Sequence, residues 1–304
     1  MTRILWVIAV ILALLPAPQL GEDATLTVDV DLVNVFFTVC NKKGNLVTDL
    51  DKDSFKVFEN DTRQVITNFS QETELPRTIA VMVDTSGSVR EKLRFEQEAA
   101  IDFLYATLRR GRDHGLIFTF DSEVNLRQDY TDDPASLAQA IRNMRAGGGT
   151  RLYDALYFAV EKLAGQEGRR AIVLISDGDD NSSRRTFTEA VEFAQRHDVT
   201  VYSISTSAVG IRIGDTRYAD SVMKTVAQET GGNSFFPQGA KELVASFKKI
   251  SKELGAQYTL GYRSTNPKRD GSFRRIRIEV DNKRYTVRAR AGYYAPQAVA
   301  ANHK

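Results

Sequence analysis

Residues 81–89 read VMVDTSGSV, in which an apolar strand runs straight into an acid and two serines. The run from Ile79 to Val83 contains no polar side chain, which is typical of a strand buried on both faces of a sheet. Asp84, Ser86 and Ser88 follow directly at its exit. Ligands of open α/β sheets bind outside the carboxyl ends of the strands. The stretch therefore predicts a central strand with a functional site at its end.

Outward from this strand, apolar strands alternate with amphipathic helices between Thr78 and Leu254. We expect strands at residues 79–83, 116–120, 171–176, 199–205 and 234–236. We expect helices at residues 93–108, from Asp133-Pro134 onward, and at 152–163, 188–197, 220–229 and 241–254. Apolar strands that are each followed by a helix imply a parallel sheet covered on both faces. The predicted fold class is α/β, a doubly wound, mostly parallel sheet flanked by helices.

The segments on either side of this region have strand patterns instead. Leu26, Val28, Val30 and Leu32 alternate with polar residues, and further short strands are expected at residues 55–60, 65–70, 258–264, 273–280 and 284–294. The last two are expected to form a hairpin through residues 281–283. Because neither end has enough strands for independent stability, we expect both to pair in one β-sandwich, residues 24–75 plus 255–296. The α/β domain, residues 76–254, is then inserted into it, and residues 297–304 form a tail.

The composition and the N-terminus indicate an exported protein without a strong charge bias. The formal net charge of +2 over 304 residues gives no indication of a nucleic-acid partner. Arg3 precedes an apolar run from Ile4 to Leu15 and then small residues, which predicts a signal peptide over residues 1–21 and a secreted, periplasmic or envelope location. The mature chain is expected to have no membrane span, and the alternative is that the signal is an uncleaved anchor. Cys40 is the only cysteine, so no intramolecular disulfide is possible, and we expect its side chain to be buried. The arginines of residues 275–290 are expected to form a solvated face.

Two further segments bring oxygen-bearing side chains to the same edge of the sheet. Asp177 follows the strand at 171–176, and Thr150 follows three glycines just before a helix. With Asp84, Ser86 and Ser88 these residues offer only oxygen donors, which hard divalent cations prefer. We therefore expect a site for Mg²⁺ or Mn²⁺. An ion held partly by neutral hydroxyls keeps much of its charge, so an Asp or Glu carboxylate of a partner protein is the expected further ligand.

These residues carry a resemblance to a known family. The runs DTSGS at 84–88 and SDGDDN at 176–181, together with Thr150, resemble the metal-ion-dependent adhesion site (MIDAS) of von Willebrand factor type A domains. The resemblance covers roughly residues 77–254. It implies that Ser86, Ser88 and Thr150 are hydroxyl ligands, and that Asp84 and Asp177 bind directly or through water. The flanking segments are similar to those of bacterial secreted proteins that contain a type A domain.

Other functions remain as alternatives to a non-enzymatic adhesion module. A metal-dependent hydrolase would use the same ion, but the sequence shows no clear general base. A structural scaffold would use the ion only to hold the loops together. A phosphate-binding P-loop is excluded, because no lysine precedes Thr150. Asp179 and Asp180 are expected to be turn or capping residues, and Asp121 to end its strand. Asn181 begins a glycosylation pattern, and a glycan there would crowd the ion.

Overall fold

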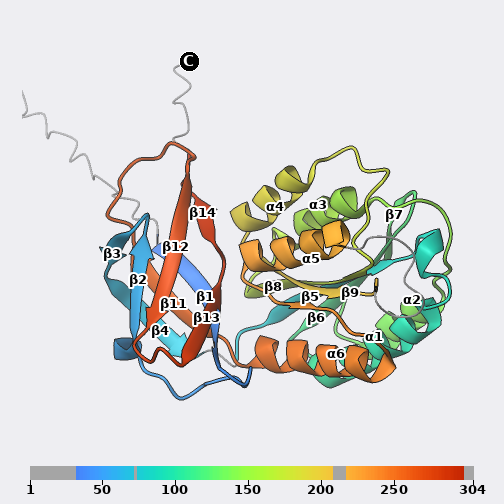
Figure 1. Cartoon of the computed structure of the whole chain (residues 1–304), viewed down its shortest axis with the longest axis horizontal. Coiled ribbons are helices and arrows are strands. Elements are labelled where there is room, and N and C mark those ends of the chain that lie inside the picture. Colours follow the sequence, from blue (N-terminus) through green and yellow to red (C-terminus); the bar gives the residue numbers. More distant parts are fainter. Residues whose placement is uncertain (1–31, 72–73, 208–216, 298–304) are drawn as a thin grey trace, which may run out of the picture. The chain divides into compact units, whose positions relative to one another are not determined.

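The computed structural model describes residues 32–71, 74–207 and 217–297 of the chain (Figure 1). The expected signal peptide, the first residues of the expected β-sandwich and nearly all of the tail lie outside these ranges. Within the described part of the chain, no helix has the length and apolar character needed to cross a membrane.

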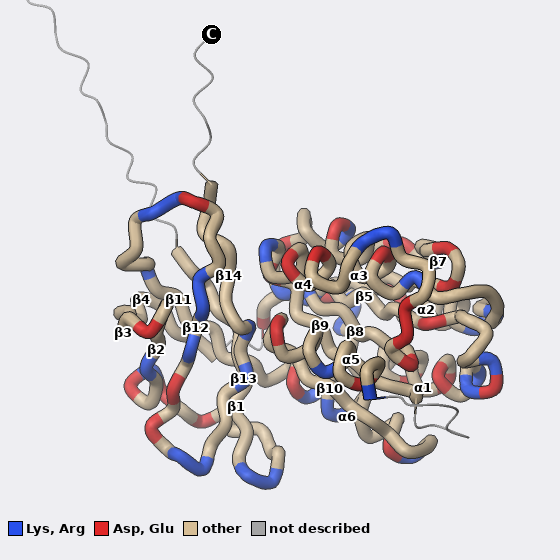
Figure 2. The backbone as a smooth tube through the Cα atoms, turned by 45° about the horizontal axis from the view of Figure 1, so that its top comes forward, with Lys and Arg blue, Asp and Glu red and all other residues tan. Residues whose placement is uncertain are grey.

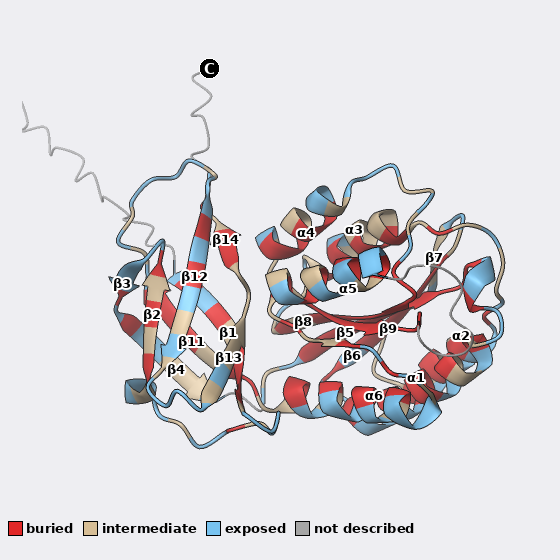
Figure 3. Ribbon diagram, in the orientation of Figure 1, coloured by how far each residue is buried: buried red, intermediate tan, exposed pale blue. Residues whose placement is uncertain are grey.

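A six-stranded sheet forms the centre of the α/β part, in the order β10-β9-β8-β5-β6-β7. Its strands are β5 (Arg77–Asp84), β6 (His114–Phe120), β7 (Val124–Thr131), β8 (Arg169–Ser176), β9 (Val199–Ser205) and β10 (Ser234–Phe235). All neighbours are parallel except β6 and β7, which pair antiparallel. Every residue of β5 is buried (Figure 3), which explains its apolar sequence. The antiparallel edge strand β7 was not predicted.

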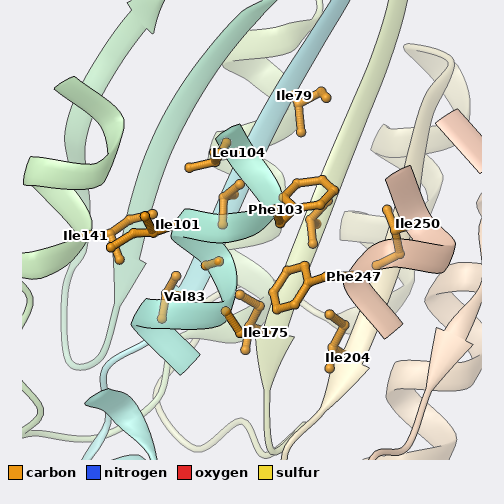
Figure 4. Packing of buried hydrophobic residues seen from close by; sticks show 14 of the residues in the cluster. Ile79, Val83, Ile101, Phe103, Leu104, Ile141, Ile175, Ile204, Phe247 and Ile250 are labelled. Atoms are coloured by element: carbon orange, nitrogen blue, oxygen red, sulfur yellow. The ribbon is translucent and has the colours of Figure 1, made fainter. Parts of the chain in front are cut away.

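Helices cover both faces of this sheet (Figure 1). On one face lie α1 (Leu93–Thr107), α2 (Pro134–Arg142) and α6 (Ala240–Gly255), and on the other α3 (Leu152–Leu163), α4 (Phe187–Arg196) and α5 (Arg217–Thr230). In the first layer, Phe103 of α1 and Phe247 of α6 pack with ring centroids 5.2 Å apart, above Ile175 and Ile204 of the sheet (Figure 4). The predicted α/β fold class is therefore confirmed.

The N- and C-terminal strands build two further antiparallel sheets together. These strands are β1 (Leu32–Asn41), β2 (Phe55–Glu59), β3 (Thr62–Gln64), β4 (Ile66–Gln71), β11 (Tyr258–Arg263), β12 (Phe273–Val280), β13 (Tyr285–Ala289) and β14 (Gly292–Tyr294), with a 3-10 turn at Lys52–Ser54. The sheet orders are β13-β1-β11-β4 and β14-β12-β2-β3, so each contains strands from both ends of the chain. One apolar core joins the two sheets, with Phe37 of β1 against Phe55 of β2 at 5.1 Å.

The expected hairpin between residues 273–280 and 284–294 is wrong. β12 pairs with β2 and β14, whereas β13 pairs with β1 in the other sheet. The chain therefore crosses from one sheet to the other in the turn at residues 281–284. Apolar residues of both β12 and β13 belong to the core that the two sheets share. Basic residues lie along β12 (Figure 2), and the exposed Arg275 and Arg277 alternate with the less exposed Ile276 and Ile278, as expected. Arg274, by contrast, is buried.

The expected solvated arginine face is found at Arg275, Arg277 and Arg284, which are exposed, but not at Arg288 and Arg290. Arg288 forms an ion pair with Glu253 at 2.7 Å, and Arg290 forms one with Asp198 at 3.0 Å, and both arginine side chains are largely buried. Cys40 is buried, as predicted, and accepts a hydrogen bond of 3.3 Å from Arg288.

Candidate metal centre

The parallel pairing of β5 with β8 brings the two predicted acids to one edge of the sheet. Asp84 is the last residue of β5, and Asp177 directly follows Ser176, the last residue of β8. Beyond Asp84 the chain turns into a short 3-10 helix, Gly87–Val89, for which Ser86 is the N-terminal capping residue. The site thus lies at the carboxyl ends of two neighbouring central strands, where open α/β sheets bind ligands.

Hydrogen bonds connect four of the five predicted site residues in a continuous series. The backbone NH of Ser86 donates to Asp84 Oδ1 at 2.9 Å, and the Ser86 and Ser88 hydroxyl oxygens are 3.0 Å apart. The Ser88 hydroxyl donates to Asp177 Oδ2 at 2.6 Å. Asp84, Ser86 and Asp177 are buried, and Ser88 is exposed. The side chains therefore form a group of oxygens that is open to solvent on the side of Ser88.

Thr150 is held beside this group by the backbone of its loop. The NH of Gly147 donates to the Thr85 carbonyl at 2.7 Å, and the NH of Gly87 donates to the Gly148 carbonyl at 3.1 Å. Thr150 itself donates its NH to Asn181 Oδ1 at 3.0 Å and is 3 % exposed. The glycine loop is thus fixed to the loops that follow both β5 and β8, which places Thr150 next to them.

Glycine is required at two turns of the site for steric reasons. Gly148 has a φ of +87°, and a Cβ there would lie 2.7 Å from the Ser122 hydroxyl. Gly178, directly after Asp177, has a φ of +86°, and its Cβ would lie 2.6 Å from the Ala219 carbonyl oxygen. Residues with a side chain rarely adopt this left-handed conformation. These two glycines allow the loops to pass close to their neighbours.

The electrostatic environment of the site disfavours two free carboxylates. Burial, and then the charge of Asp177, raise the pKa of Asp84 to about 6, although hydrogen bonds from Ser86 and Ser176 act in the opposite direction. Burial and the charge of Asp177 also raise the pKa of Asp179. A divalent cation among these groups would offset both effects, because it favours the ionised form of each acid.

The donor set suits a hard cation. Two carboxylates and three hydroxyls provide oxygen atoms only, as Mg²⁺ and Mn²⁺ require. Among the described residues, no group of three or more His, Cys, Asp or Glu side chains is arranged to hold a metal ion. The candidate centre differs from such a group, because serine and threonine hydroxyls make up the majority of its donors. The residues present therefore fit the predicted cation.

The structure also places the nearby acids that the sequence assigned to other roles. Asp180 Oδ1 accepts hydrogen bonds from the Tyr153 NH and the Ser183 hydroxyl, a turn and capping role. Asp121, just after β6, accepts a hydrogen bond of 3.1 Å from the Thr85 hydroxyl. The Asn181 side chain holds the Thr150 loop, so its amide oxygen is already in use.

Two residues of the site were not predicted from the sequence. Ser176 donates its hydroxyl to Asp84 Oδ2 at 2.7 Å and accepts from the Gly178 NH at 3.0 Å, so it connects both acidic loops. Glu96, on the inner side of α1, is 1 % exposed and interacts electrostatically with Asp84 and Asp177. Glu96 could have been found from the sequence, because it is an acid on the otherwise apolar helical face between Leu93 and Ala100.

Comparisons with known proteins agree with this fold. Residues 79–179 match the family model of the von Willebrand factor type A domain, which confirms the resemblance for this part of the chain. The vWF domain of the type V pili tip protein Mfa5 from Porphyromonas gingivalis superposes with a TM-score of 0.50 at 15% identity, covering 59% of this chain and 95% of that one. BatB from Bacteroides thetaiotaomicron has a TM-score of 0.47 at 17% identity, and the match covers 58% of this chain and 98% of that one.

A third solved structure is that of proximal thread matrix protein 1 from the mussel byssus, with a zinc-occupied MIDAS motif. It superposes with a TM-score of 0.51 at 15% identity, covering 64% of this chain and 49% of its own. This chain thus spans about half the length of that protein. No curated protein sequence matches the chain.

Proposed function

We propose that the chain is a non-enzymatic protein-binding module that acts through a divalent cation, Mg²⁺ or Mn²⁺. Asp84, Ser86, Ser88, Thr150 and Asp177 would hold the ion. The cation supplies a positive centre with an open coordination position, and the protein supplies the oxygens that fix the ion at the edge of the sheet. A partner protein would donate an Asp or Glu carboxylate to that position.

One observation carries this proposal, the hydrogen-bonded series from Asp84 through Ser86 and Ser88 to Asp177. The two acids are 93 positions apart in the sequence. They are nevertheless connected, through the backbone NH and hydroxyl of Ser86 and the hydroxyl of Ser88. Such a group has more acceptor oxygens than donors, and its acids repel each other. A cation is the simplest species that satisfies both.

The chemistry of the donors supports an acidic partner. Three of the five proposed ligands are neutral. The two carboxylates together carry no more negative charge than the divalent ion carries positive charge, so the site has no excess negative charge that would repel a further carboxylate. Magnesium keeps several of its waters in proteins and takes only one or two carboxylates directly, so a position remains for the carboxylate of a partner. The exposed Ser88 marks the solvent side of the group, from which a partner carboxylate would approach.

The comparisons support the same class of function by analogy, because a sequence identity of 15% shows a shared fold and nothing further. In the mussel byssus protein, zinc occupies the MIDAS motif. Mfa5 is a pilus tip protein. With the signal peptide expected at residues 1–21, these analogies favour a place outside the cell or in the envelope.

Replacement of Asp84 tests the proposal. In Asp84→Ala, we expect Mn²⁺ binding and Mg²⁺-dependent capture of envelope proteins to be lost, while the far-UV circular dichroism stays unchanged. Asp102→Ala, which removes an exposed acid of α1, is the matched control and should behave as the wild type. Mn²⁺ titration followed by electron paramagnetic resonance, and pull-downs in Mg²⁺ or EDTA, give the two measurements.

Three results would contradict the adhesive role. Wild-type protein that binds no Mn²⁺ would remove its basis. A lower melting temperature in EDTA with unchanged capture would indicate a structural scaffold. Metal-dependent hydrolysis of a phosphoester or acyl ester, lost in Asp84→Ala, would indicate a hydrolase.

A further inference from the structure

Glu96 is a buried acid whose carboxyl forms no hydrogen bond of normal geometry with the described residues. It lies on the inner side of α1, and its side chain is 1 % exposed. Neither Oε1 nor Oε2 accepts a hydrogen bond from any described residue. The hydroxyl of Thr206, just after β9, is also buried and without a hydrogen bond. Buried polar atoms are rarely left in this condition, because each costs free energy unless it is paired.

Lys92 compensates only in part for the charge of this carboxyl. Lys92 precedes Glu96 by four positions, but its ammonium group donates to the Thr206 carbonyl at 2.7 Å. Burial and the charge of Asp84 raise the pKa of Glu96 to about 8, with the charge of Asp177 adding to them. The Thr206 hydroxyl, which faces the carboxyl without reaching the geometry of a full hydrogen bond, and the charge of Lys92 act in the opposite direction. Thr206 is joined to the proposed site, because its NH donates to the Ser176 carbonyl at 2.9 Å and the Ser176 hydroxyl donates to Asp84 at 2.7 Å.

A structural role alone accounts poorly for this position. Leu93 and Ala100, on the same side of α1, pack into the apolar core of the first helix layer. An apolar residue at position 96 would continue that face without any cost of burying a polar group. At this position the carboxylate of Glu96 would be attracted by the positive charge of a cation bound at the proposed site. A positive ion near Asp84 would remove the repulsion between the acids, and water bound to that ion would supply hydrogen-bond donors.

We propose that Glu96 is a positioning residue of the cation centre, a third acidic group that acts on the ion through water bound to it. This inference rests on the proposed function, since it requires a cation at Asp84, Ser86, Ser88, Thr150 and Asp177. Magnesium and manganese keep part of their water shell in proteins, and acids that orient such ligands contribute to metal affinity.

The test compares the Mn²⁺ affinity of the full chain with that of two variants at neutral pH. Glu96→Gln keeps the shape of the side chain and removes its charge. Glu98→Gln is the matched control, because Glu98 lies two positions later on α1, is exposed and forms an ion pair with Arg94. We expect Glu96→Gln to weaken Mn²⁺ binding by about tenfold, the lower limit for residues that orient metal ligands. Its melting temperature in EDTA should be equal to or above that of the wild type.

The outcomes separate this inference from the proposed function. Wild-type protein without Mn²⁺ binding contradicts both. Equal Mn²⁺ affinity of the wild type and Glu96→Gln contradicts only the role of Glu96, and so does an equal loss in Glu98→Gln.

A measurement on the wild type decides the matter if Glu96→Gln does not fold. In crystals soaked with Mn²⁺, we expect an anomalous peak beside Asp84 and a water bound to it within hydrogen-bond distance of a Glu96 oxygen. A Glu96 carboxyl remote from every metal-bound water would overturn the inference.

Discussion

Asp113 is the buried acid on which two arginines of the α/β part converge. Its side chain is fully buried, and Arg77 at the start of β5 donates to it from the backbone NH and the guanidinium at 2.5–3.1 Å. Arg109, after α1, donates to both of its oxygens at 2.9 Å. Burial alone would raise the pKa of Asp113, but the hydrogen bonds from Arg109 and Arg77 hold it well below its usual range.

This pairing predicts a stability difference that depends on pH. Because the pKa of Asp113 is lowered on folding, its stabilisation is present above the ordinary value of 3.8 and is lost as the pH falls below it. In Asp113→Asn, the free energy of unfolding at pH 6 should be about 3–5 kcal/mol lower than in the wild type, since the buried Arg77 cation loses its carboxylate partner. Urea unfolding of both proteins from pH 6 to pH 3 measures this. A difference that stays constant over that range would contradict the assignment.

At the scale of single residues, the sequence predicted what is local and missed what depends on distant partners. Asp84, Ser86 and Ser88 lie within one short motif, so their proximity follows from the chain itself. The contact of Ser176 with Asp84 depends on the pairing of β5 with β8, and the burial of Glu96 depends on how α1 packs. Neither contact belongs to a sequence motif. The acid Glu96 within an apolar helical face does indicate, however, that this position has a role other than core packing.

Among the elements of the site, the turn after β8 has the strictest backbone requirement. Gly178→Ala would introduce a Cβ at a φ of +86° and 2.6 Å from the Ala219 carbonyl oxygen at the start of α5. We expect a loss of about 1–3 kcal/mol in stability from the backbone strain, and weaker Mn²⁺ binding because Asp177 is displaced. Gly165→Ala, at an open position after α3, is the control and should change neither. Calorimetry and Mn²⁺ titration decide the question, and equal behaviour of both variants would contradict it.

The strands show why some elements were assigned correctly and others were not. β5, β8 and β9 are apolar runs with helices after them, a pattern that is typical of a parallel sheet covered on both faces. β7 is a half-exposed edge strand with a mixed sequence, so its pattern is weak. β12 and β13 follow one another across a short turn, which favours a hairpin locally. In the structure β13 pairs with β1 and β12 pairs with β2, so they lie in different sheets.

For the whole molecule, the sheet orders make the N-terminal strands dependent on the C-terminal ones. β11 lies between β1 and β4, and β12 lies between β2 and β14. Tyr258, Leu260 and Tyr262 of β11 are fully buried in the core that the two sheets share. Without residues 258–297, β1 and β4 lack their shared neighbour, and only the pair β2 and β3 remains, which is too small to be stable by itself.

A chain that ends at Gln257 should therefore lose the order of its first strands while keeping the α/β part. This end point retains the contacts of Gln257 with Arg169 and Tyr202 at 3.2–3.3 Å, so these two residues of the central sheet keep their polar partner. It removes Arg288 and Arg290, the partners of Glu253 and Asp198. In limited proteolysis with mass spectrometry, we expect cleavage throughout residues 32–71 and protection of residues 77–207. A chain that ends at Gln297 is the control and should be protected in both. If residues 32–71 resist cleavage equally in the two chains, the strands of the N-terminus fold without those of the C-terminus, and the interleaved sheets are not what stabilises them.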